Sequence, residues 1–411
     1  MAVLLKTSTS VLPKYLLFLI ALPALAVAGN TELVGHTKLN VVGQTYPSDS
    51  VLHDLYDSHS ADAQGELRLN LTHRRNGWRF DANYQLVALY GDTFVLPDDR
   101  RRYMDLTSII GEGSKSALAH RLDRLSIAYM SEKFVARLGR QALSWGNGLF
   151  YAPMDLVNPF NPATIDVEYK AGDDLLYLQY LADSGADVQA AYVVRRNYLS
   201  AEVDSRSATT AVKYHGFAGE GEFDVLLARH YQDDVLGLGA SHALGSANWS
   251  GDLVITDTDT DSYVQLSTNL SYSWIWHGRN MSGVVEYHFN GMGQPSGQYD
   301  LVSLTQNPDL FLRLAREEAF ALGRHYLAGS VLVEVTPLWS VTPTLLMNIS
   351  DPSGLLQLVS QYSLSDNMTL LGSLNIPVGS NGSEFGGIES AIPGRYLSSG
   401  AGIFAQLAWY F

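Results

Sequence analysis

The stretch Tyr263-Val-Gln-Leu-Ser-Thr-Asn-Leu-Ser-Tyr-Ser-Trp-Ile-Trp-His277 alternates apolar and polar residues over most of its length. Val264, Leu266, Leu270 and Tyr272 share one phase, and serine, asparagine and glutamine fill the other. A β-strand places successive side chains on opposite faces, so the pattern predicts a strand with one apolar and one polar face. Its length and its aromatic residues at one end are typical of a transmembrane strand ending in an interfacial girdle.

The same alternation recurs along the chain, with charged residues on the polar phase, for example over 80–90, 281–289 and 403–411. It predicts an all-β fold, a transmembrane antiparallel up-and-down β-barrel of about 18 strands. The candidate strands lie near residues 31–43, 62–75, 78–90, 118–131, 134–143, 173–182, 186–196, 207–217, 221–231, 234–244, 248–257, 263–277, 280–290, 324–336, 338–350, 353–364, 367–377 and 400–411.

The connections between these strands alternate in length. Short connections rich in turn formers lie at 75–77, 131–133, 183–185, 219–220, 245–247, 278–279, 337 and 365–367, and long ones at 44–61, 91–117, 144–172, 197–206, 291–323 and 378–399. A barrel with both termini in the periplasm has short inner turns and long outer loops. One missed strand would break this parity, so about 16 or 20 strands stay open.

The N-terminus has the layout of a secretory signal peptide. Lys6 and Lys14 precede an apolar run from Tyr15 to Leu25 and then Ala26-Val-Ala28, which predicts a signal peptide over 1–28 and a barrel domain over 29–411. No later stretch approaches the roughly 18 apolar residues that a spanning helix needs. The expected location is the bacterial outer membrane, among lipid and lipopolysaccharide, and a water-soluble all-β protein is the alternative.

The last strand ends in Phe411, and such a terminus resembles the recognition signal of outer-membrane barrels. We therefore expect the barrel-assembly machinery as a partner. The oligomeric state stays open, because a protomer contact would be apolar like a lipid face.

Composition narrows the remaining partners. There is no cysteine, which excludes disulfides, thiolate metal sites and an N-terminal lipid-modified cysteine. The net charge of −15 argues against nucleic acid or polyphosphate as a partner.

A barrel of about 18 strands encloses a lumen too wide for side chains to fill, so we expect passive passage of small polar solutes. Charges on the polar phase mark candidate pore-lining residues: Arg68, Arg74, Arg79, Asp81, Arg124 and Arg137 on early strands, and Glu222, Asp224, Asp252, Glu286 and Glu334 on later ones. Two opposite walls of this kind would set up a transverse field that orients dipolar solutes. The alternative is that the charges only hydrate the lumen or pair with neighbours.

Alternation stops near Ser144, where a long and unusually apolar loop begins. Such a loop is expected to pack against something, and the lumen is the nearest shelter. We predict that this loop folds inward as a constriction formed by Trp145, Phe150, Tyr151, Asp155, Asn158 and Phe160. Its aromatic rings either pack against the wall or offer a solute a stacking surface.

The run Gly139-Arg-Gln141 with Ser144-Trp-Gly146 resembles a strand-to-loop motif in poorly characterised porin-like outer-membrane proteins of Gram-negative bacteria, including alginate-export-like barrels. The resemblance covers about 30 residues and the barrel layout. It implies a diffusion or export channel with Arg137 and Arg140 lining the pore. Strict alternation from Arg137 would place Arg140 in lipid, so a bulge near Gly139 is expected. The sequence shows no continuous arginine ladder, which argues against a polyanionic substrate.

A second long loop predicts a capped helix. Asn307 is the expected N-cap, Pro308 opens the first turn, and Gly323 is the expected end. Its apolar positions Phe311, Leu314, Ala315 and Ala319 either cover the barrel mouth or pack within the loops.

The tract Thr256-Asp-Thr-Asp-Thr-Asp-Ser262 offers hard oxygen ligands at Asp257, Asp259 and Asp261. Calcium is the candidate ion there, and a solvated turn is the alternative. No other cofactor is expected.

An enzyme is not expected, because no serine elbow or His-Glu-x-x-His pair is present, and Ser282 and His288 lie in one strand. Two other functions stay open: an export channel docked to a periplasmic machine, and a largely closed barrel with a structural or envelope-assembly role.

Overall fold

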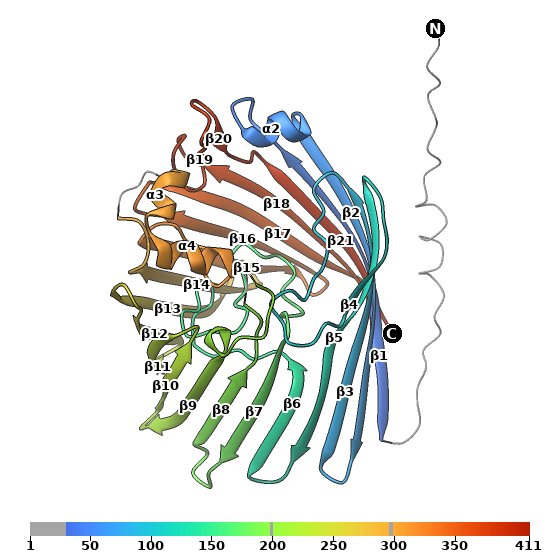
Figure 1. The fold of residues 1–411 in the computed structure, drawn as a ribbon, viewed down its shortest axis with the longest axis vertical. Helices are drawn as coiled ribbons and strands as arrows, with labels where there is room; N and C mark the ends of the chain where they lie inside the picture. Colours follow the sequence, from blue (N-terminus) through green and yellow to red (C-terminus); the bar gives the residue numbers. More distant parts are fainter. Residues whose placement is uncertain (1–29, 198–199, 296–298) are drawn as a thin grey trace.

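The computed structural model describes residues 30–197, 200–295 and 299–411, and the predicted signal peptide lies outside these ranges. The described chain forms a closed antiparallel barrel (Figure 1). Its wall consists of β1 (Thr31–Thr45), β2 (His59–Arg75), β3 (Trp78–Gly91), β5 (Ser116–Met130), β6 (Phe134–Gln141), β7 (Asp173–Leu181), β8 (Asp187–Val193), β9 (Thr209–Ala218), β10 (Gly221–His230), β11 (Asp233–Leu244), β12 (Ala247–Asp257), β13 (Ser262–Trp276), β14 (Arg279–Asn290), β15 (His325–Thr336), β16 (Trp339–Asn348), β17 (Ser353–Ser365), β18 (Met368–Val378) and β21 (Gly402–Tyr410). β1 pairs with β2 and also with β21, and this second pairing closes the ring.

The predicted fold class and strand number are confirmed. The predicted strand 263–277 is β13, Ser262–Trp276. The strand predicted over 186–196 ends earlier, at Val193, because Arg195 and Arg196 form isolated bridges with Arg102 and Val203. Three short strands lie in segments predicted as loops: β4 (Thr107–Glu112) and the hairpin β19 (Ile388–Glu389) and β20 (Tyr396–Leu397). β4 pairs with β5 over Ala117–Arg121, the part of β5 that β6 does not reach.

Apolar side chains point out of the barrel and polar side chains point in. On β13, Leu270 is 39% exposed and Trp276 60%, whereas Ser267 and Asn269 are buried. Near the tight turns the outer face is aromatic, with Trp78, Tyr129, Trp276 and Trp339 exposed. Such an aromatic band marks the polar boundary of a bilayer.

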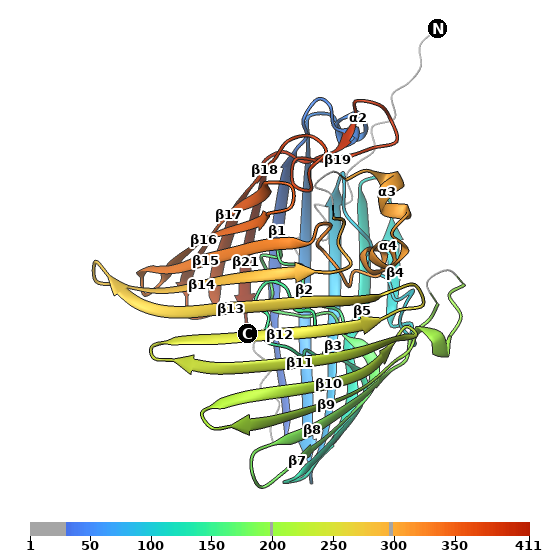
Figure 2. The same cartoon turned by 90° about the vertical axis from the view of Figure 1, so that its left-hand side faces the viewer.

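The two ends of the barrel differ as predicted from connection lengths. Asn76-Gly77 and His277-Gly278 are two-residue turns in which both residues have positive φ, the conformation that joins tight hairpins. The long loops lie at the opposite end, where α3 (Leu301–Thr305) and α4 (Pro308–Ala315) also lie (Figure 2). No helix of the described residues is long and apolar enough to cross a membrane.

The predicted helix beginning at Asn307 is correct at its start and wrong at its end. The Asn307 side chain accepts a hydrogen bond from the Leu310 N–H, and Pro308 opens α4. The helix stops at Ala315 rather than near Gly323, because Glu317 has a positive φ and Glu318 turns toward His230, at 3.3 Å. Phe311 stays exposed.

Arg140 lies neither in lipid nor among free lumen charges. It is 2% exposed, and its guanidinium pairs with Asp99 at 2.8 Å and Asp174 at 2.9 Å. No register shift interrupts β6. Instead Gly139 has a φ of +120°, and a Cβ there would lie 2.2 Å from the Leu125 carbonyl oxygen. The expected bulge is thus replaced by a glycine whose backbone conformation other residues rarely adopt.

Candidate functional site

Residues 142–172, which join β6 to β7 and are here called the inner loop, fold into the barrel and contact the polar face of the wall. The contacts follow the order of the strands: Trp145 with Gln189 (β8), Asn147 with Asp252 (β12), Tyr151 with Glu286 (β14), Ala163 with Gln357 (β17), Asp166 with Gln406 (β21), Glu168 with Lys38 (β1), Tyr169 with Asn70 (β2) and Lys170 with Arg124 (β5). The inner loop therefore runs around most of the inner circumference of the barrel.

Five consecutive backbone N–H groups of the inner loop donate to two carboxylates of the wall. Asn147 and Gly148 donate to Asp252 at 2.6 and 3.1 Å, and Leu149, Phe150 and Tyr151 donate to Glu286 at 2.6, 3.1 and 2.7 Å. Both carboxylates are 1% exposed, and no ion pair within the described ranges includes either of them. Successive N–H groups that point to one side bind an anion well, so these dipoles stabilise the two buried charges.

The Ser144-Trp-Gly-Asn-Gly148 motif makes this arrangement possible. Gly146 has a φ of +96°, and a Cβ on it would lie 2.7 Å from Asp252 Oδ2 and 2.9 Å from Met154 Cβ. Only glycine lets the backbone approach the carboxylate this closely. Trp145 precedes it and donates its indole N–H to Gln189 at 2.7 Å.

On the other side of the barrel the inner loop supplies the acids and the wall supplies the cations. Lys38 Nζ lies 2.6 Å from Asp166 and 2.7 Å from Glu168, and Lys38 is 3% exposed. The Arg68 guanidinium lies 4.1 Å from the centre of the Tyr169 ring, within cation–π distance.

Lys170 joins the two ends of the inner loop. Its ammonium group donates to the Leu143 carbonyl at 2.6 Å and to the Ser144 hydroxyl at 2.8 Å, and it pairs with Asp155 at 2.5 Å. The loop is therefore closed on itself as well as bound to the wall.

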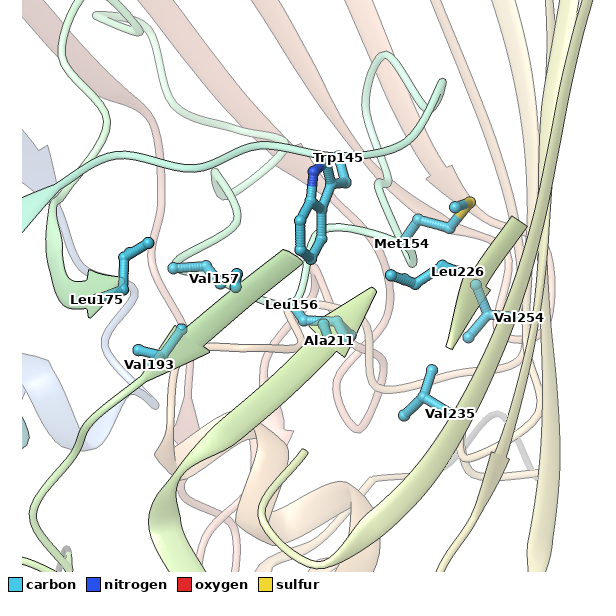
Figure 3. Packing of buried hydrophobic residues seen from close by; sticks show 11 residues of the cluster. Trp145, Met154, Leu156, Val157, Leu175, Val193, Ala211, Leu226, Val235 and Val254 are labelled. Atoms are coloured by element: carbon cyan, nitrogen blue, oxygen red, sulfur yellow. The ribbon is translucent and has the colours of Figure 1, made fainter. Parts of the chain in front are cut away.

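A hydrophobic cluster fills the space between the inner loop and strands β7 to β12. Trp145, Met154, Leu156 and Val157 of the loop pack against Leu175, Ala191, Val193, Ala211, Leu226, Val235 and Val254 of the wall (Figure 3). The wall is apolar on its inner face here, so this part of the lumen is packed protein rather than water.

The predicted constriction residues fall into two groups. Trp145 and Tyr151 are buried, and Tyr151 stacks on His288 with ring centres 4.6 Å apart. Phe150 is half-buried, Asp155 pairs with Lys170, and Asn158 donates to the Ala171 carbonyl at 3.3 Å. Phe160 is 37% exposed, and two further side chains of the inner loop, Leu149 and Val167, are 56% and 55% exposed.

The predicted pore-lining charges lie on opposite walls, but most of them have partners. Arg68 pairs with Asp123 and Glu66, Arg124 with Asp123, Arg79 with Asp81, and Asp224 with Lys213. Arg74 is exposed and pairs with Glu32, and Glu222 and Glu334 are exposed and accept hydrogen bonds from Ser241 and Asn280. Arg137 is half-buried. Because Asp252 and Glu286 bind the inner loop, the acidic wall is less open to solute than the sequence suggests.

Lys38, Lys170, Arg121 and Asp123 were not among the predicted site residues. Lys38 and Arg121 lie on the inward-facing phase of their strands, so the alternating pattern could have identified them. Asp123 lies at a register shift between β3 and β5, which alternation could not locate.

The candidate calcium tract forms a turn. Asp257 accepts from the Ser262 hydroxyl, and Thr258 and Thr260 donate to Asp309 on α4. No three His, Cys, Asp or Glu side chains within the described ranges are grouped so as to hold a metal ion. Calcium binding there stays a prediction.

The last long loop buries an acid, Glu384, that has no ion pair among the residues that the structure describes. Glu384 accepts hydrogen bonds from the Tyr326 hydroxyl at 2.6 Å, the Asn348 amide at 2.7 Å and the Leu322 N–H at 3.0 Å. Burial raises the pKa of the Glu384 carboxyl to about 7, although these donors oppose the shift. The loop residue Phe385 packs beside this group, against the cluster that contains Tyr151 and Tyr326.

Neither family models nor curated proteins match the chain in sequence. Among solved structures, OccAB4 of Acinetobacter baumannii is 9% identical with a TM-score of 0.54, over 93% of this chain and 98% of that one. A triple mutant of the Rhodopseudomonas blastica porin is 8% identical with a TM-score of 0.45, over 93% and 100%. At such low identity the similarity to OccAB4 bears on the fold alone.

We predict that Glu286→Gln loosens the inner loop. The amide keeps the size of the side chain but turns an NH2 group toward buried N–H donors, which costs about 1–3 kcal/mol per unsatisfied group. Amide hydrogen exchange at residues 149–151 should become faster and the free energy of unfolding should fall. Glu222→Gln, on the same wall but exposed, is the control; equal exchange in both variants would contradict the assignment.

We predict that Glu384 makes the last long loop less stable at higher pH. A carboxyl whose folded-state pKa is raised stabilises the fold fully below its ordinary value of 4.5, and this contribution is lost as the pH rises through about 7. Unfolding free energies measured from pH 5 to pH 8 should therefore fall, and Glu384→Gln should flatten the curve. Glu389→Gln, in the same loop, should leave the slope intact. A slope unaffected by Glu384→Gln would refute this explanation.

Proposed function

We propose that this protein is a porin-like channel of the bacterial outer membrane that passes small polar solutes passively, with the inner loop as its constriction. The circuit of contacts between the inner loop and the wall carries this proposal. A loop that is bound to several sides of the wall narrows the lumen. It does not form a plug at one end of the barrel.

The outer surface supports the location. Apolar side chains face outward on successive strands, an aromatic band lies near the tight turns, and the long loops gather at the other end. Lipid and lipopolysaccharide would contact this surface. The Gly35 N–H donates to the Phe411 carbonyl at 2.8 Å, and the Phe411 N–H donates to the Gly35 carbonyl at 3.0 Å. Because these bonds occupy the terminal strand in the closed barrel, the assembly machinery would bind that strand before the barrel closes.

The exposed side chains of the inner loop support contact with solute. Leu149, Phe160 and Val167 are exposed, and Val167 lies between Asp166 and Glu168, which both pair with Lys38 of the wall. A path with exposed apolar side chains next to polar, ion-paired groups suits small solutes that combine polar and apolar parts. A catalytic role has no comparable support. Ser282 contacts Ser273 rather than His288. Ser267 does lie 2.8 Å from His288, but both residues are buried and the Ser267 hydroxyl also contacts the Tyr151 carbonyl.

Liposome swelling tests the channel. Liposomes that contain the protein should swell in arabinose, more slowly in sucrose, and hardly in larger oligosaccharides, because the inner loop limits the cross-section. Protein-free liposomes are the control. No swelling in arabinose would refute the channel and favour a closed structural barrel or an export channel that needs a periplasmic partner.

A cysteine introduced on the inner loop tests the constriction, and the absence of native cysteine makes labelling specific. Phe160→Cys or Val167→Cys, modified with a bulky methanethiosulfonate reagent, should show a stepwise drop in single-channel conductance. Ile392→Cys, exposed in the last long loop, should show none. A conductance that stays constant after complete labelling at both inner-loop positions would exclude them from the path.

A further inference from the structure

A cavity of about 360 Å³ lies at the long-loop end of the barrel. It is lined by segments far apart in sequence: the loop before β4, β5, the residues after β8, the turn after β10 and the end of α4. Six arginines contribute to its lining, namely Arg100, Arg101, Arg102, Arg121, Arg195 and Arg316. Such a concentration is notable in a chain with a net charge of −15.

Three of the four acidic residues of the lining pair closely with an arginine. Asp173 pairs with Arg195 at 2.8 Å, Glu317 with Arg101 at 2.8 Å, and Asp98 with Arg100 at 3.5 Å. Glu318 lies 3.3 Å from His230, which is buried. The acids therefore offset part of the positive charge but offer little to a bound cation.

Arg121 and Arg316 are the least compensated of the six. Arg121 lies 3.9 Å from Asp123, which is closer to Arg68 and Arg124, at 2.8 and 3.1 Å. Arg316 reaches Glu318 only at 4.0 Å. An acid that is shared with other cations, or that lies far away, neutralises an arginine only in part, so both residues keep excess positive charge. Both side chains are also partly accessible, at 24% for Arg121 and 18% for Arg316.

Tyr231 helps to hold two of these guanidinium groups. Its ring centre lies 3.9 Å from the Arg316 guanidinium carbon and 5.0 Å from that of Arg195. A guanidinium over an aromatic face keeps its N–H groups directed along its own plane, available to an oxygen acceptor.

The cavity adjoins the inner loop. Asn158 of the inner loop lines it, as does Asp173, where the chain re-enters the wall. A solute that enters from the long-loop end would meet this cavity before it passes the inner loop.

We propose that the cavity binds a compact multivalent oxyanion, such as inorganic phosphate or a small phosphate ester, ahead of the constriction. A planar monocarboxylate is satisfied by one guanidinium, whereas a tetrahedral oxyanion accepts N–H donors from several sides, and the arginines approach from four segments. This assignment of a solute class rests on the proposed channel function.

Calorimetry on the detergent-purified full chain tests binding without transport. Inorganic phosphate should bind the wild type, and Arg121→Gln with Arg316→Gln should weaken binding by about tenfold or more. Arg395→Gln, which removes an arginine of the last long loop paired with Asp54, is the matched control and should bind like wild type. The proposal is overturned if the wild type does not bind phosphate, if acetate binds equally well, or if the double variant binds unchanged.

Swelling with a matched solute pair separates this proposal from the channel itself. Glycerol 3-phosphate should enter more slowly through the double variant than through wild type, while glycerol enters both at one rate, which also shows that the variant has folded. If neither solute enters the wild type, the channel fails and calorimetry alone decides the cavity. Equal slowing of both solutes would contradict a role for the two arginines in recognising an anion.

Discussion

Two buried carboxylates and five successive peptide N–H groups determine where the inner loop lies. Polar backbone groups shut away from water need partners, and residues 147–151 have neither a helix nor a strand to supply them. Asp252 and Glu286 accept those hydrogen bonds from the wall. In turn the N–H groups offset charges that would otherwise be costly to bury. Each side of this contact therefore requires the other.

The rest of the inner loop extends this contact around the barrel. Apolar side chains next to the five N–H groups fill the space against β7 to β12, while Asp166 and Glu168 reach Lys38 on the far side. Lys170 then joins the end of the loop to its beginning. Ion pairs, hydrogen bonds and packing each hold a different part of the inner loop. The loop therefore keeps its position without forming a helix or strand. An irregular segment is thereby held in one position inside the barrel.

Much of the fold could be predicted because a barrel strand is a local pattern. The alternation of Tyr263–His277 alone indicated which side chains of β13 face out, and the connection lengths indicated which end carries the long loops. The inward folding of the loop was predicted for residues 144–172 from their apolarity. Their path could not be predicted, because Glu286 binds backbone N–H groups, and backbone donors have no sequence signature. The end of α4 was missed for a similar reason, since Glu318 contacts His230 from a distant strand.

We propose that the inner loop, held at Asp252 and Glu286, sets the free cross-section of the lumen. Single-channel conductance of a variant that lacks residues 150–161 tests it most directly, with folding checked by the heat-dependent change in gel mobility of barrels. We expect a folded variant with a clearly higher conductance than wild type, because much of the loop that lines the inside of the wall is gone. A folded variant with unchanged conductance would contradict the claim.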